Sequence, residues 1–223
     1  MKRSELIAAA GVVGVAGLSM GAADKTLPLL GKPIKKPASG NVQVAVLISD
    51  LATVIDFAGP WETFQDAGYD THVVSKTLDV VTATNGLKIV PEYTFETAPQ
   101  PNVVVIGAQK APPEALTWIR KVGPGADVVM SVCTGAFILA RTGLLDGEYA
   151  TTHHEYYDKF EKEFPKVHLV RGPRFVENEQ TCCAGGLTSG IDLALRVVER
   201  YDGKAAADGL AFYMEHVRTA RPA

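Results

Sequence analysis

The sequence predicts an α/β fold in which a mainly parallel sheet lies between two layers of helices, a doubly wound three-layer sandwich. Two observations predict it. Short apolar runs typical of buried strands alternate along the chain with longer runs that have helical periodicity. The chain also has 223 residues, of which 47% are apolar and 21% charged, which suits one soluble domain with a sizeable core. Strands that are each followed by a helix need crossover connections, and crossovers produce parallel neighbours.

The N-terminus has the pattern of an export signal. Lys2–Arg3 precede the apolar stretch Leu6–Met20, and Gly21–Ala23 are the small residues that a signal peptidase recognises. We therefore expect residues 1–23 to be a signal peptide and the protein to be exported, with the periplasm as its compartment. An uncleaved anchor is disfavoured because the apolar run is Gly/Ala-rich and shorter than the ~20 strongly apolar residues of a membrane span. Glu5 keeps open a structural helix in a cytoplasmic protein.

Residues 24–40 contain three prolines and four lysines and show neither helical nor strand periodicity. They are interpreted as a linker. The folded domain is expected to cover residues 41–223.

The domain then shows the alternation in order. Strands are predicted at Val42–Ile48, His72–Val74, Val103–Ile106 and Val128–Val132, and helices at Pro60–Ala67, Pro112–Val122, Thr134–Arg141 and Ile191–Tyr201. Val80–Val90 carries Asn85-Gly86 between two β-rich runs, which predicts an inserted hairpin. Ligands of such folds bind at the carboxyl ends of the strands, where Asp50, Gly107 and Cys133 are expected to gather.

The segment Ala126–Gly143 has the layout of a nucleophile elbow, with Cys133 on the turn between a strand and a helix. The helix N-terminus would favour the thiolate, and the small Gly135 would let a substrate approach the backbone. The alternative is that Cys133 is a small buried apolar residue, the usual role of a free cysteine.

Two other residues are candidate partners of the thiol. Asp56 follows the first strand and stands before Pro60, so its carboxyl would lie over the same sheet edge. It could equally be a helix N-cap. His153 is expected at the end of a short strand after the elbow helix, although a lone histidine is more often structural.

Cys182 and Cys183 are adjacent within a predicted strand, so their side chains should face opposite sides of the sheet as two reduced thiols. No CxxC spacing accompanies them, and no metal site is predicted. In an exported protein a catalytic Cys133 would be the unpaired thiol and would be open to oxidation.

Four motifs together carry a family resemblance. They are DFAGPWE near the start, VVSKTLDVVTATNGLKIVPEYTF in the centre, SVCTGAFILARTGLLDGEYATTHH at the elbow and GGLTSGIDLALRV near the end. From Val42 to about Met214 the chain resembles the PfpI-type superfamily, which has the parkinsonism-associated deglycase fold, and within it the isonitrile hydratase branch. The resemblance implies a flavodoxin-like fold related to class I glutamine amidotransferases, a homodimer, a small-molecule substrate, and no metal or organic cofactor.

Carried onto this chain, the resemblance makes Cys133 the nucleophile, Asp56 the acid/base carboxyl and Thr134 a helper that binds the substrate nitrogen or orients water. His153 matches a histidine that lies near the cysteine in several branches. A thiolate can attack an isonitrile carbon, which must also receive a proton, so the thiol and one carboxyl are the minimum equipment. Thr134 could instead be only a first-turn helix residue.

The departures from the family pattern also have consequences. Many hydratases have Gly-Gly after the third core strand, where backbone amides hold the developing anion, whereas this chain has Gly107 and Ala108. Ala108 can still donate its N–H. The pattern leaves open whether Gln109 and Lys110 line the pocket. Peptidase-like members have histidine directly after the cysteine, which disfavours proteolysis here, and His216 lacks the His-x-Glu order of amidotransferases.

Three other functions stay open on the sequence. One is a glyoxalase or deglycase-type reaction, and another is a redox-stress role with reversible oxidation of Cys133. The third is a ligand-sensing domain akin to AraC-type regulators, which would need a downstream helix-turn-helix region, and none is expected in the chain that ends at Ala223. A formal charge of −3 with scattered basic residues predicts no nucleic-acid partner, and no stable membrane partner is expected.

Overall fold

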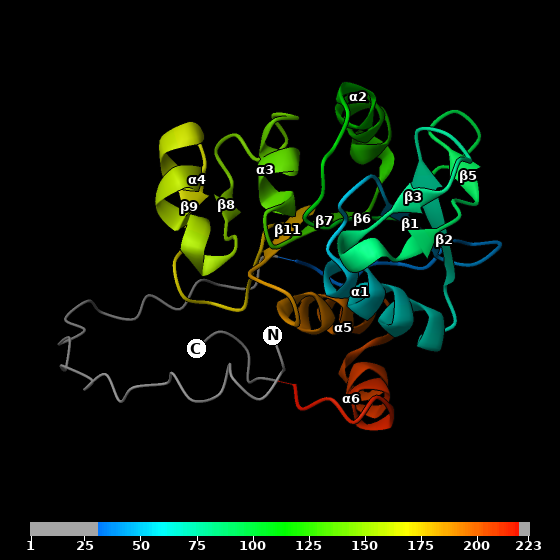
Figure 1. Ribbon diagram of the computed structural model, residues 1–223. Coiled ribbons are helices and arrows are strands. Elements are labelled where there is room, and N and C mark those ends of the chain that lie inside the picture. The colour runs from blue at the N-terminus through cyan, green and yellow to red at the C-terminus, as the bar shows by residue number, and fades with distance from the viewer. Residues whose placement is uncertain (1–30, 219–223) are drawn as a thin grey trace, which may run out of the picture.

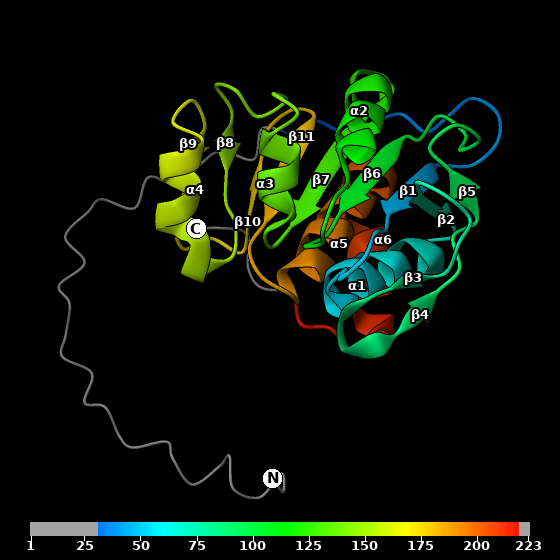
Figure 2. The same cartoon turned by 45° about the horizontal axis from the view of Figure 1, so that its top comes forward.

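The computed structural model describes residues 31–218, which form a three-layer α/β sandwich (Figures 1 and 2). Its central sheet has seven strands in the order β10-β11-β7-β6-β1-β2-β5, and every neighbouring pair is parallel except β10 and β11. The strands are β1 (Gln43–Leu47), β2 (Asp70–Ser75), β5 (Tyr93–Thr94), β6 (Val103–Ile106), β7 (Val128–Val132), β10 (Phe175–Glu177) and β11 (Thr181–Ala184). The predicted doubly wound fold is confirmed.

Helices cover both faces of the sheet. The helices are α1 (Val54–Asp66), α2 (Pro113–Val122), α3 (Gly135–Ala140), α4 (Tyr157–Glu163), α5 (Ser189–Asp202) and α6 (Lys204–Tyr213). Helices α1 and α5 pack on one face and α2, α3 and α4 on the other, so the core divides into two clusters of buried side chains. Helix α6 packs against α5, away from the sheet (Figure 1).

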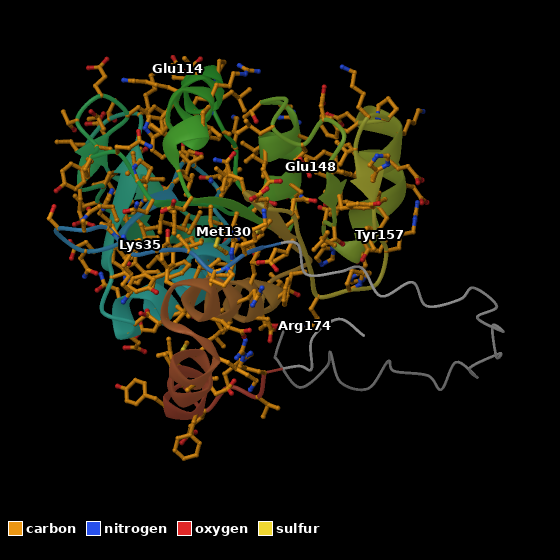
Figure 3. The ribbon with its side chains drawn as sticks, turned by 180° about the vertical axis from the view of Figure 1, so that it is seen from behind. Lys35, Glu114, Met130, Glu148, Tyr157 and Arg174 are labelled. Carbon is orange, nitrogen blue, oxygen red and sulfur yellow. The ribbon has the colours of Figure 1, made fainter. Side chains whose placement is uncertain are left out.

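The central strands are apolar along their whole length because both of their faces are covered. Strands β6 and β7 are fully buried, and Met130 of β7 lies in the middle of the molecule (Figure 3). The predicted hairpin is also present. Strands β3 (Val81–Thr82) and β4 (Lys88–Ile89) pair antiparallel around the 3-10 turn Thr84–Gly86, where Asn85 and Gly86 have positive φ.

The start of the first helix was predicted wrongly. Helix α1 begins at Val54, not at Pro60, and Pro60 lies inside it. Proline lacks an N–H, so the carbonyl of Asp56 receives no helical hydrogen bond from position 60. The helix tolerates this loss because Pro60 is buried against the neighbouring helix, where Gly190 of α5 packs on its ring.

Several short elements have no clear periodicity and were not predicted. They are helices α4 and α6, edge strands β5 and β10, the short strand β9 (His168–Leu169) and the 3-10 turns Gly123–Gly125 and His154–Tyr156. Strand β9 pairs in parallel with β8 (Tyr149–Ala150), the short strand that was predicted before His153. Among residues 31–218, no helix combines the length and apolar character that a bilayer crossing needs.

The segment before β1 has no helix or strand, but it is packed against the domain. Arg200 of α5 donates from Nε to the Lys32 carbonyl at 3.0 Å and accepts at its own carbonyl from the Ile34 N–H at 2.7 Å. Arg196 donates to the Gly31 carbonyl at 3.0 Å. The packed unit therefore begins before Asn41, and the proposed linker is not a free spacer over its described part. Residues 1–23, the predicted signal peptide, lie outside the described residues.

Candidate active site

The predicted elbow is present between β7 and α3. Cys133 has φ +59°, a conformation that costs energy for a residue with a Cβ and that turns the chain sharply at the end of the strand. Two hydrogen bonds hold this turn: the Cys133 N–H donates to the Gly185 carbonyl at 2.5 Å, and Thr152 Oγ1 donates to the Cys133 carbonyl at 2.8 Å. Cys133 is 8% exposed.

Asp56 lies beside this thiol and is completely buried. It is the third residue of α1, whose N-cap is Thr53, so the alternative in which Asp56 itself caps the helix is wrong. Its Oδ2 accepts the Ala108 N–H at 3.0 Å. Its Oδ1 makes no hydrogen bond of good geometry among the described residues, although the Cys133 thiol and the Leu187 N–H are near enough to influence the carboxylate. One carboxylate oxygen is therefore anchored and the other is available for chemistry.

Burial dominates the protonation of the pair. Desolvation raises the pKa of Asp56 to about 6, although the Ala108 N–H, the Cys133 thiol and the Leu187 N–H each favour the charged form. Desolvation and the negative charge of Asp56 raise the pKa of Cys133 to about 12, against the opposing effect of the Thr134 and Leu187 amides. Both shifts favour a thiol beside a carboxylate at neutral pH over the thiolate that the helix N-terminus alone suggests, because burial and the charge of Asp56 oppose ionisation of Cys133.

The three small residues predicted at the site have structural roles in this state. The Ala108 N–H is bonded to Asp56 and is not free to hold an anion. A Cβ on Gly107 would lie 3.0 Å from the Cβ of Asp56. A Cβ on Gly135 would lie 2.1 Å from the Ile106 carbonyl oxygen, so this glycine permits α3 to approach β6. That it also lets a substrate approach the backbone stays a prediction.

Thr134 is the N-cap residue of α3, yet its side chain makes no capping hydrogen bond. Thr134 lines a cavity of about 190 Å³, and Gln109 also belongs to its lining. Lys110 instead lines a separate cavity of about 470 Å³ beside the β3 hairpin. Of the two residues left open by the sequence, Gln109 is therefore the one next to the elbow.

His153 follows β8 as predicted. Its ring contacts Glu155, His154 and Gly186. Its Nδ1 accepts the Glu155 N–H at 3.3 Å, and its ring stacks on His154 with centroids 4.4 Å apart. Its Cδ2 lies against Gly186, where an added Cβ would come within 2.3 Å. His153 therefore supports the loop that follows β11.

Sequence reasoning missed two groups that contact the pair. The Leu187 N–H acts on both Asp56 and Cys133, and Leu187 itself has φ +54°. Thr152 holds the Cys133 carbonyl. The GGLTSG and TTHH motifs mark both segments in the sequence, but a backbone amide acting from a left-handed leucine has no sequence signature.

The adjacent cysteines occupy opposite sides of β11, as predicted. Cys182 belongs to the cluster under α1 and α5, and Cys183 to the cluster under α2 and α3, and both are free and fully buried. Burial raises the pKa of each thiol, that of Cys183 to about 11. Within residues 31–218 no three His, Cys, Asp or Glu side chains gather as a metal site would require.

This geometry can be compared with known proteins. The model of the DJ-1/PfpI family matches residues 42–200, a span that runs from β1 to α5 and includes Asp56 and Cys133. The chain belongs to the DJ-1/PfpI family. Its elbow cysteine and buried carboxylate are thus placed within a recognised fold, and the resemblance noted from the motifs is confirmed at family level.

Relatives of this DJ-1/PfpI protein include an enzyme and regulators. It is 31% identical over 183 residues to isonitrile hydratase of Pseudomonas putida, covering 78% of each chain. It is 28% identical to the HTH-type transcriptional regulator GbdR of Pseudomonas aeruginosa, covering 82% of this chain but only 53% of the regulator. The structure of a ThiJ/PfpI family protein from Pseudomonas syringae superimposes with a TM-score of 0.71 at 27% identity, covering 92% of this chain and 84% of that one.

Proposed function

We propose that this DJ-1/PfpI protein is a cysteine-dependent hydratase that converts an isonitrile and water into an N-substituted formamide. The observation that carries the proposal is the Cys133–Asp56 pair, a protonated nucleophile beside a carboxylate whose pKa of about 6 suits a proton shuttle at neutral pH. The similarity to isonitrile hydratase supports the same reaction class.

In the first step, the sulfur of Cys133 attacks the isonitrile carbon while its proton passes to Oδ1 of Asp56, the oxygen that the Ala108 N–H does not hold. Asp56 then delivers this proton to the same carbon. A C–S bond and a C–H bond form, one bond of the N≡C unit is lost, and the product is an S-linked thioimidate, R–N=CH–S–Cys133. The shuttle avoids the free thiolate, which the site disfavours.

In the second step, Asp56 removes a proton from water, and the resulting hydroxide adds to the thioimidate carbon. The tetrahedral intermediate collapses with cleavage of the C–S bond, and the nitrogen and the sulfur each end with one proton. R–NH–CHO leaves and the Cys133 thiol is restored. The Thr134 hydroxyl, which is not used as a cap, is placed beside the elbow to donate to the substrate nitrogen or to orient the water.

Turnover of cyclohexyl isonitrile to the formamide, followed by chromatography, tests the proposal. We expect kcat/KM to rise as the pH increases through about 6, since Asp56 must be ionised to accept the thiol proton, and to level off above that pH. Cys133→Ala should be inactive. The kcat of Asp56→Asn should be about a hundredfold or more lower, and its kcat/KM should no longer rise as the pH increases through about 6. An active Cys133→Ala variant would refute the mechanism.

A ligand-sensing role is the second candidate, because several of the matched relatives are transcriptional regulators. The chain spans only about half of the regulator GbdR, so the activity of that whole protein does not transfer. Saturable binding of an isonitrile with no product after many hours would favour sensing over catalysis. Conversion of methylglyoxal but not of isonitriles would favour the glyoxalase alternative.

A further inference from the structure

The cavity beside the elbow extends along the outer face of helix α3. Its volume is about 190 Å³, room for about six water molecules at ~30 Å³ each. Its lining consists of side chains from α3, from α4 with its preceding turn, and from the loop after β6: Gln109, Thr134, Phe137, Ile138, Arg141, Tyr156 and Lys159. Helices α3 and α4 lie on the same face of the sheet in both cartoon views (Figures 1 and 2), and Tyr157 marks α4 in Figure 3.

This cavity lies next to the elbow, although neither Cys133 nor Asp56 belongs to its lining. Thr134 directly follows Cys133 in the chain, and Gln109 directly follows Ala108, which holds Asp56. The third wall, Tyr156, comes from the turn that His153 begins. A substrate whose carbon meets Cys133 would reach this space by passing the group on its nitrogen over Thr134.

The charge of the lining is positive. It contains two cationic side chains, Arg141 and Lys159, and no acidic one. Lys159 Nζ lies 5.7 Å from the ring centroid of Phe137, and no ion pair of Lys159 occurs within residues 31–218. Arg141 has one ion pair, a 3.6 Å contact with Glu163 in which both side chains are 38–49% exposed. Such half-exposed pairs are weak and open easily.

The length of the cavity follows from helix geometry. Thr134 and Arg141 are seven residues apart, about 10 Å along a helix. The guanidinium of Arg141 lies 3.6 Å from the carboxylate of Glu163, the last residue of α4. Phe137 and Ile138 contribute apolar side chains to the lining.

We propose that this cavity selects isonitriles whose nitrogen carries a short chain ending in an anionic group, a carboxylate being the simplest. The inference rests on the proposed hydratase function and names its substrate class. In this proposal the apolar side chains of Phe137 and Ile138 contact the chain, and Arg141 and Lys159 bind the carboxylate. The cavity at the β3 hairpin is less suited to this role because its cations, Lys76 and Lys110, share the lining with Asp50 and Asp79.

The test compares 4-isocyanobutanoate with 4-isocyanobutanamide, which has nearly the same shape and no charge. The wild-type protein should show about tenfold higher kcat/KM for the carboxylate, mainly through KM, and rising salt should reduce the preference. Arg141→Met and Lys159→Met should each lower kcat/KM for the carboxylate about threefold and leave the amide unchanged. Glu163→Gln should instead raise kcat/KM for the carboxylate, because it removes the ion-pair partner that competes for Arg141.

Lys162→Met is the matched control. Lys162 lies on the same helix as Lys159 and is exposed, but it does not line the cavity, so the same loss of charge should leave the preference unchanged. Equal kcat/KM for the two substrates, or a preference that Lys162→Met reduces as much as Lys159→Met, would overturn the inference.

A binding measurement separates this inference from the hydratase proposal. Calorimetry with Cys133→Ala should show that N-formyl-4-aminobutanoate binds more tightly than N-formyl-4-aminobutanamide, and that Lys159→Met in the same background removes the difference. A preference for the anion without any isonitrile turnover would refute the hydratase and retain an anion-selective cavity. Equal binding of the two formamides would refute the cavity assignment even if isonitriles are hydrated.

Discussion

At the scale of single residues, the site depends on one proton shared between two groups that both resist ionisation. Asp56 with a pKa of about 6 is charged at neutral pH, and its charge keeps the proton on Cys133. A resting thiol is a poor target for stray electrophiles and oxidants, whereas a substrate that reaches both groups can draw the proton to Asp56. The pair therefore combines a protected nucleophile with a nearby base.

This protonation state predicts slow but ordered alkylation of the three thiols. With limiting iodoacetamide at pH 7.5, Cys133 should react about a hundredfold or more slowly than an ordinary exposed cysteine, because its pKa is raised to about 12. It should still react before Cys182 and Cys183, since only Cys133 has any exposed surface. Peptide mass mapping over time gives the order. First labelling of Cys182 or Cys183 would contradict the nucleophile assignment.

The buried carboxylate also predicts an unusual pH dependence of stability. The folded pKa of Asp56 is raised from 3.8 to about 6, so the folded state loses stability as the pH rises from about 4 through 6. Asp56→Asn removes that loss and should stabilise the protein above pH 7 by about 2–3 kcal/mol. Thermal melts should show a higher Tm than wild type at pH 7.5 and almost the same Tm near pH 4. A lower Tm at pH 7.5 would show that Asp56 has a stabilising structural role instead.

At the scale of elements, long periodic segments were predicted well, and positions decided by tertiary contacts were not. The apolar runs of β1, β6 and β7 and the helical periods of α2 and α5 are strong enough to appear in the sequence alone. The first turn of α1 was missed because Pro60 usually begins a helix, whereas here packing against Gly190 holds it inside one. Cys133 and Asp56 were found because their motifs stand at strand ends. The Leu187 amide depends on a loop conformation that no residue type specifies.

Gly135 stands where helix α3 comes close to strand β6, and its replacement gives a testable prediction. Gly135→Ala would place a Cβ 2.1 Å from the Ile106 carbonyl oxygen, so α3 must move away from β6. We expect a loss of about 3 kcal/mol and a Tm about 10 °C lower, together with reduced turnover. The control is Gly209→Ala in α6, where nothing lies within 4 Å. That variant should keep or slightly raise the Tm because alanine favours helix. Equal melting of the two variants would contradict this account.

At the scale of the whole molecule, the folded unit extends beyond the span of the family match. The backbone of Gly31 and Lys32 is bound by two arginines of α5, and a Cβ on Gly31 would lie 2.0 Å from Oε1 of Glu177. Glu177 forms ion pairs with Arg196 and Arg200. Glycine is therefore required where the segment crosses this buried group of charges. Through these contacts α5 and β10 hold the residues that precede the first strand.

Removal of this segment should therefore destabilise the domain without changing its chemistry. A chain that begins at Asn41 should unfold about 2–4 kcal/mol more easily than one that begins at Asp24, because the backbone hydrogen bonds of Gly31, Lys32 and Ile34 to two arginines of α5 are lost. Urea unfolding measures the difference, and KM should be unchanged. Identical midpoints for the two chains would show that the contacts contribute nothing.

Export of the protein stays a prediction from the sequence. Lys2–Arg3, the apolar run and Gly21–Ala23 predict cleavage after Ala23 and accumulation in the periplasm. Cell fractionation followed by N-terminal sequencing checks this directly. Recovery of an intact Met1 end from the cytoplasm would support the alternative of a structural helix.

The placement of Cys182 and Cys183 on opposite faces of one strand has a consequence for measuring the dynamics of this protein. Cys182 lies under one helical layer and Cys183 under the other. The labelling rate of each thiol therefore measures how often its own layer opens locally. If the domain opens only as one cooperative unit, both thiols become accessible at the same rate under mild denaturant. Faster access to Cys183 would mean that the layer of α2, α3 and α4, which includes the elbow helix, opens while the layer of α1 and α5 stays closed.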